Sequence, residues 1–131
     1  MGRILVGTCG WTDPTLLSSG WYPPDAKTAE ARLQHYASVF PLVEVDSTYY
    51  ALPSSRNAAL WVDRTPEGFL FDVKVFRLFT HHPTPRSSLP KDVEKEIPAS
   101  PGPGSSLYLK DTPGEVKGEL LRRFTDALLP L

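Results

Sequence analysis

Three short apolar runs, each followed by a loop and a segment with helical spacing, constrain the fold of this chain more than any other feature. The predicted strands are 3–7, 42–46 and 69–75, and the predicted helices are 28–40, 54–65 and 115–129. Apolar runs of this length that border on Gly or Pro indicate buried strands. Alternation of strands with helices indicates parallel strands joined by right-handed crossovers. The sequence therefore predicts an α/β fold.

Each predicted helix carries its apolar residues on one face. The predicted buried positions are Leu33, Tyr36, Ala37 and Phe40 in the first, Ala58, Trp61 and Val62 in the second, and Leu120, Leu121, Phe124, Ala127 and Leu128 in the third. His35 lies on the opposite face of the predicted helix 28–40 from these apolar residues, so we expect its side chain to be exposed to solvent. The segment 8–27 is rich in Gly and Pro and predicts a long loop.

Charged side chains fall on one face of two predicted strands. Because strand side chains alternate between faces, Glu44 and Asp46 share one face of their strand, and Asp72 and Lys74 share one face of theirs. A sheet covered by helices on both sides would bury these charges at a high cost. A TIM-barrel-type (β/α) arrangement instead points them inward, near the C-terminal mouth where active sites of that fold lie. The pattern favours the barrel.

A carboxylate beside an ammonium group suits general acid–base chemistry, metal binding or recognition of an anion. We therefore predict Glu44, Asp46 and Lys74 as catalytic residues. Lys74 would hold an anionic group or act as an acid, and Glu44 or Asp46 would act as a base or a metal ligand. The alternative is a structural network of ion pairs, and Asp72 fits that alternative best.

Four sequence blocks together carry a family resemblance. They are GTCGW at 7–11, WYP at 21–23, VEVDSTYY at 43–50 with Leu52-Pro53, and FLFDVK at 69–74 with Arg77 and Thr80-His81 after it. In these blocks, over about residues 3 to 82, the chain resembles the DUF72 (YecE-like) family. The resemblance implies a barrel similar to those of xylose isomerases and endonuclease IV, with no assigned activity. Asp46 departs from the family, in which Asn is usual at that position.

The length predicts an incomplete barrel. A complete barrel needs about 200 residues or more, whereas this chain has 131. We therefore expect a partial barrel with about three of eight (β/α) units. Residues 1–131 would form the N-terminal portion of one DUF72-like domain, and 83–105 would be a Pro/Gly/Ser-rich loop insertion without regular structure.

Aromatic residues near the same mouth are predicted to bind substrate. Trp11 and Tyr50 would stack on a sugar or a base. We prefer Tyr50 to Tyr49 because it falls on the side of Glu44 if the extended backbone continues. Cys9 is also placed at the mouth, although a lone cysteine is more often a small buried residue than a nucleophile.

Arg77 and His81 complete the predicted substrate-binding set because both fall in the block that resembles the family. The pair His81-His82 does not predict a metal site. Neighbouring residues of an extended chain point apart, and the HxH and HExxH spacings are absent. The two histidines therefore predict no metal ligands, a metal site at the inward carboxylates stays open as an alternative, and the cofactor is unknown.

Composition limits the partners. The chain has 14 basic and 15 acidic residues, one cysteine and no apolar run long enough for a membrane span. These features predict a cytoplasmic protein with no membrane partner, and the charged residues at the mouth allow a small-molecule ligand. Self-association is possible if the chain folds, because it would cover the unpaired edge strand and the exposed inner face of a three-stranded sheet. Two alternatives stay open: a nucleic-acid-binding or -processing protein, which the charge balance disfavours, and a truncated remnant without function.

Overall fold

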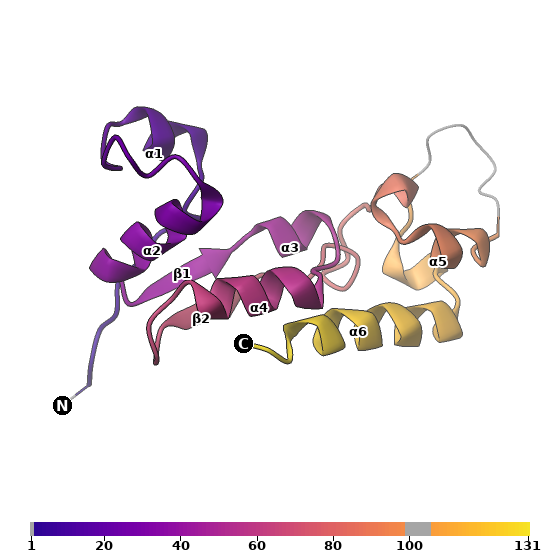
Figure 1. The fold of residues 1–131 in the computed structure, drawn as a ribbon. Helices are drawn as coiled ribbons and strands as arrows, with labels where there is room; N and C mark the ends of the chain where they lie inside the picture. Colours follow the sequence, from indigo (N-terminus) through magenta and orange to yellow (C-terminus); the bar gives the residue numbers. More distant parts are fainter. Residues whose placement is uncertain (1, 99–105) are drawn as a thin grey trace.

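The computed structural model describes residues 2–98 and 106–131, which form a mixed arrangement of helices and strands (Figure 1). The elements follow in the order α1 (Pro14–Ser18), α2 (Ala29–Val39), β1 (Leu42–Val45), α3 (Ser47–Tyr50), α4 (Ser55–Asp63), β2 (Leu70–Val73), η1 (Arg86–Ser88), α5 (Lys91–Lys95), η2 (Leu109–Asp111) and α6 (Gly114–Leu128). The α/β class predicted from the alternating pattern is confirmed in this coarse form.

The sheet of the described residues consists of β1 and β2, which pair in parallel. Leu42 lies opposite Leu70 and Val45 lies opposite Val73, and α4 forms part of the crossover between the two strands. Val43 and Val45 are buried, whereas Glu44 between them is partly exposed. The predicted parallel pairing and the predicted alternation of faces along β1 are both confirmed.

The first predicted strand, 3–7, is not a strand of this sheet. Ile4 is 90% exposed and Val6 is 64% exposed. The chain joins β1 only afterwards, where Glu44 N donates to Thr8 O at 3.0 Å and Gly10 N donates to Glu44 O at 2.8 Å. The prediction of a buried strand at 3–7 is wrong, because no layer of the described chain covers these apolar side chains.

Capping residues place the longer helices where the sequence predicts them. The Thr28 side chain accepts a hydrogen bond from Ala31 N at the start of α2, and the Ser54 side chain accepts one from Asn57 N at the start of α4. The segment 8–27 is mostly loop, as expected, although it contains the short helix α1.

Three side chains on these helices differ from their predicted burial. Val62 is 39% exposed and Leu121 is 50% exposed, since the buried stripes of α4 and α6 are narrower than the apolar pattern suggested. His35 is not a solvated residue. It is half-buried, and its ring centroid lies 4.8 Å from that of Trp21.

The proline-rich segment also differs from its prediction. An irregular stretch was expected throughout, but η1 and α5 form within it, and Leu89, Val93 and Ile97 are buried. The prediction is therefore wrong for the part up to residue 98, because these apolar residues find a surface on α6. Residues 99–105 of the expected insertion lie outside the described residues.

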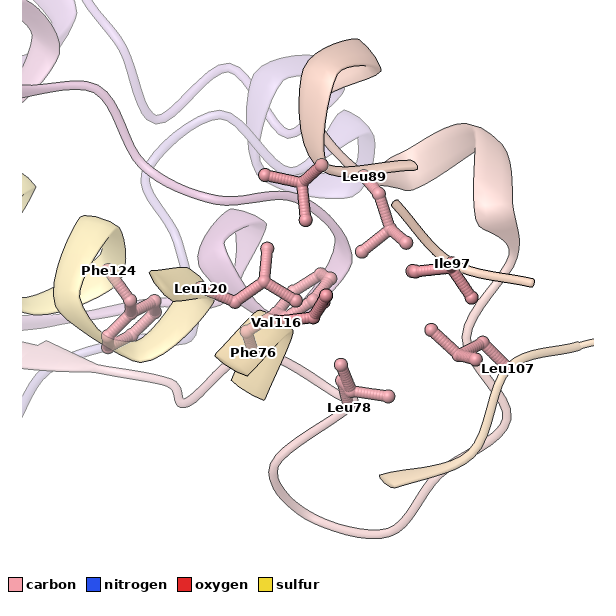
Figure 2. Packing of buried hydrophobic residues seen from close by; sticks show 9 residues of the cluster. Phe76, Leu78, Leu89, Ile97, Leu107, Val116, Leu120 and Phe124 are labelled. Carbon is pink, nitrogen blue, oxygen red and sulfur yellow. The ribbon is translucent and has the colours of Figure 1, made fainter. Parts of the chain in front are cut away.

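Two hydrophobic clusters hold the described elements together. In the first, Tyr36, Val43 and Val45 lie among the aromatic side chains between α2, α4 and the sheet. The second joins the residues after β2 to α5 and α6, and Figure 2 shows its members converging on Phe76. Val73 contacts both clusters. Helices α4 and α6 also pack along each other (Figure 1).

Candidate functional site

Glu44 and Lys74 meet on the exposed face of the sheet. The Nζ atom of Lys74 lies 3.5 Å from Oε1 of Glu44. Lys74 follows β2 directly, and its backbone N donates to Val45 O at 3.0 Å, so the parallel pairing continues by one residue. Asp72 lies opposite Glu44 in the register. The geometry brings together the carboxylate and the ammonium group that the alternation predicted to share a face.

Cys9 contacts the same carboxylate. Its Sγ donates to Glu44 Oε1 at 3.2 Å, and the thiol is exposed rather than buried as expected. The hydrogen bond to Glu44, partial burial and the charge of Asp46 raise the pKa of Cys9 to about 11. Because only the thiolate is a nucleophile, the raised pKa favours the neutral thiol, which donates to Glu44.

This arrangement predicts slow alkylation of Cys9 by iodoacetamide. At pH 8 the native thiol should react more slowly than the same thiol in urea, since a pKa of about 11 leaves few thiolates. Glu44→Gln removes the largest cause of the raised pKa and should speed the reaction several-fold. This increase in the alkylation rate is partly offset, because a thiolate with a lower pKa is a weaker nucleophile. Glu115→Gln on α6 is the matched control, and equal rates for the two variants would contradict the assignment.

Asp46 and Lys74 are the other two predicted catalytic residues near Glu44. The charge of Glu44 is the largest cause that raises the pKa of Lys74, so Lys74 stays an ammonium group. Asp46 raises the pKa of Lys74 and of Cys9 as well. Asp46 lies beside Gly10, where an added Cβ would be 3.6 Å from Asp46 Oδ1. The three predicted catalytic residues therefore share one region of charge.

Tyr49, not Tyr50, lies at this group. Its ring centroid is 5.5 Å from Lys74 Nζ. The backbone does not stay extended after β1 as expected, because α3 begins at Ser47 and turns Tyr50 outward, where it is 59% exposed. Thr48 fixes this turn, since its Oγ1 donates to Lys74 O at 2.6 Å. Asp46-Ser47, a pair of residues typical of helix starts, was the sequence signal that could have predicted α3.

Arg77 also reaches Tyr49. Its guanidinium carbon lies 5.6 Å from the ring centroid, and its backbone N donates to Tyr49 O at 3.0 Å. On the same ring the structure places His82, with ring centroids 5.7 Å apart. His81, which the sequence analysis preferred, is exposed with a φ of 62°. Tyr49 and His82 are therefore the neighbours of Lys74 and Arg77 that sequence reasoning missed.

Trp11 is half-buried and packs against the first cluster, not beside Glu44 and Lys74 as predicted. Its ring meets Trp61 edge to face with centroids 5.8 Å apart, and it packs in the first cluster with Val43 and Val45. The Tyr22 hydroxyl donates to Trp11 O. Trp11 thus packs the long first loop against the first cluster.

The described residues hold neither a cluster of metal ligands nor a membrane-spanning helix. Among residues 2–98 and 106–131, no three His, Cys, Asp or Glu side chains are grouped as ligands of one metal ion. No helix in the described part of the chain has the length and apolar character required to cross a bilayer.

Three similarities to known proteins were found. The sequence model of the family described as "Protein of unknown function DUF72" matches residues 5–131. UPF0759 protein YunF of Bacillus subtilis (strain 168) is 41% identical over 95 residues, which are 72% of this chain and 31% of YunF. The crystal structure of a DUF72 family protein (EF0366) from Enterococcus faecalis V583 has 28% identity and a TM-score of 0.45, covering 75% of this chain and 29% of that one. The chain thus spans about a third of the length of YunF.

Proposed function

This chain belongs to the DUF72 family, and on that premise we propose that Glu44, Asp46 and Lys74 take part in an enzyme reaction on a small polar or phosphorylated substrate. The observation that carries the proposal is the contact of both Lys74 Nζ and Cys9 Sγ with one oxygen of Glu44, at 3.5 Å and 3.2 Å. A carboxylate held between an ammonium and a thiol at an exposed position is placed to exchange protons with a bound molecule.

Each residue has a distinct role in this proposal. Lys74 holds an anionic group of the substrate or donates a proton to it, since Glu44 keeps it charged. Glu44 acts as the base when a substrate anion draws Lys74 away, because the contact between them is a single long one. Asp46 adds negative charge beside Gly10 and favours the protonated form of Lys74.

We further propose that the chain is the N-terminal part of a TIM-barrel-type domain, with about three of eight (β/α) units and with 83–105 as an insertion. The parallel pairing of β1 and β2 supports this proposal, as does the bridge between Cys9 and Glu44 on the other edge of β1. The chain's match to 31% of YunF agrees with it. In such a barrel the face that bears Glu44 would line the interior.

Lys74→Met tests the proposed function. We expect at least one of glycerol 3-phosphate, glucose 6-phosphate and glycolate to raise the melting temperature of the chain by a few degrees, because a ligand that binds only the folded state stabilises it. Lys74→Met should abolish that shift. The measurement is a thermal melt followed by near-ultraviolet circular dichroism at equal protein concentrations.

Lys110→Met, an exposed lysine of η2, is the matched control and should respond as the unmodified chain does. A Lys74→Met chain that is stabilised as strongly as the control would count against the proposal. A failure of all three compounds to stabilise the unmodified chain would count against it as well.

A further inference from the structure

Arg77 carries a charge that the described chain does not balance. No carboxylate of residues 2–98 and 106–131 forms an ion pair with it, and the remaining residues include no Asp or Glu. Its Nε atom is buried without a hydrogen-bond partner among the described residues. Buried polar atoms and charges are almost always paired, so an unpaired one needs an explanation.

The backbone holds Arg77 in place. It lies between Phe76 and Leu78, which are both 0% exposed in the second cluster. Its N donates to Tyr49 O at 3.0 Å, and its O accepts from His82 N at 3.1 Å. The guanidinium is therefore presented from a fixed turn, which lowers the entropy cost of binding a ligand.

A second cation lies on the same aromatic ring. Tyr49 has Lys74 Nζ 5.5 Å and the Arg77 guanidinium carbon 5.6 Å from its ring centroid. Cation–π attraction supports each charge separately, but two like charges around one ring repel each other. In the described residues Lys74 has one counter-ion, Glu44 at 3.5 Å, and its ammonium has three donors. An anion that contacts both cations would relieve the repulsion.

We propose that Arg77 and Lys74, which both lie at the ring of Tyr49, bind the phosphate group of a small phosphomonoester. A phosphomonoester carries a charge near −2 at pH 7, so it balances Arg77 and competes with Glu44 for Lys74. The planar fork of Arg suits two phosphate oxygens, and Lys adds a point charge. This inference rests on the proposed function, whose substrate class it names. The rest of the substrate would then extend from Lys74 toward Glu44.

A small phosphomonoester fits better than a nucleic acid. Binding to a nucleic-acid backbone depends on many basic residues along one surface. The chain has 14 basic against 15 acidic residues and a net charge of −1. Two cations on one tyrosine ring make a local site and not an extended basic surface.

Isothermal titration calorimetry of the chain with inorganic phosphate, methyl phosphate and dimethyl phosphate at constant ionic strength tests this site. We expect one phosphate and one methyl phosphate bound per chain, and at least tenfold weaker binding of the singly charged diester. Arg77→Met should weaken phosphate binding roughly 10- to 100-fold, since hydrogen bonds to a charged group are lost. Arg56→Met is the control, because Arg56 is exposed on α4, and it should bind phosphate normally.

Three results would overturn the inference. They are an unchanged phosphate affinity in Arg77→Met, equal binding of the diester and the monoester, and Arg77-dependent binding of a single-stranded oligonucleotide that is tighter than that of phosphate. If Arg77→Met loses its near-ultraviolet dichroism, Arg77→Lys replaces it. Arg77→Lys keeps the positive charge but loses the planar guanidinium group, so it should bind phosphate several-fold more weakly. An undiminished phosphate affinity of Arg77→Lys would overturn the inference too.

Glu44→Gln separates this inference from the proposed function. It removes the base and leaves Arg77 and Tyr49 in place, so it should still bind phosphate. Loss of phosphate binding in both Arg77→Met and Lys74→Met, with no stabilisation of the unmodified chain by the substrate panel, would refute the proposed function alone. Unchanged phosphate binding by Arg77→Met, with a response to the substrate panel that Lys74→Met abolishes, would refute the phosphate site alone.

Discussion

Phe76→Ala will lower the free energy of unfolding by about 3–5 kcal/mol, the range for removing a buried Phe side chain. Phe76 is 0% exposed, and Figure 2 shows Leu120 and Val116 of α6 around it. The cavity cannot close easily, because the surrounding side chains come from α5, α6 and the chain after β2. Urea denaturation followed by tryptophan fluorescence measures the loss.

Leu121→Ala is the matched control for this prediction. Leu121 lies on α6 next to Leu120 in sequence but is 50% exposed, so its truncation should cost less than about 1 kcal/mol. Similar losses for Phe76→Ala and Leu121→Ala would show that the second cluster does not pack as the structure describes. Because Phe76 precedes Arg77, Phe76→Ala should also weaken phosphate binding by the chain.

Local sequence signals predicted the three longer helices and the alternation of faces along β1. Thr28 and Ser54 cap α2 and α4 as the sequence indicated, because a capping side chain acts on backbone groups only a few residues away. The alternation of Val43, Glu44 and Val45 predicted which face of β1 is buried. The spacing of apolar residues and the capping of helices depend on residues close together in the sequence. They can therefore be predicted without knowing which distant segments pack nearby.

Burial and the members of the site depended on contacts between distant segments. Ile4 and Val6 have the composition of a buried strand, but no element of the described chain covers them. Tyr49 was passed over for Tyr50 because one turn of helix, α3, reverses the direction of the side chains after β1. The alternation of faces predicted that Glu44 and Lys74 would share one side of the sheet. It did not predict Tyr49, whose ring lies beside Lys74.

Gly7→Ala will destabilise the chain by about 1–3 kcal/mol, the usual cost of forcing an extra methyl group into a packed position. A Cβ on Gly7 would lie 2.2 Å from Leu42 O, a backbone atom of β1 that no change of rotamer can move. The nearby backbone is tied down as well. Thr8 N donates to the Tyr36 hydroxyl at 2.7 Å, and that hydroxyl donates to Leu42 O at 3.1 Å.

The strain at Gly7 should reach the candidate site, which gives this prediction a second measurement. Moving residues 7–10 away from β1 separates the Cys9 thiol from Glu44, lowers the pKa of Cys9 toward that of a free thiol and speeds its alkylation. Gly2→Ala is the control, because nothing lies within 4 Å of its added Cβ. If Gly7→Ala matched Gly2→Ala in both urea denaturation and alkylation, residues 7–10 would not be packed on β1, and Cys9 would have no part in orienting Glu44.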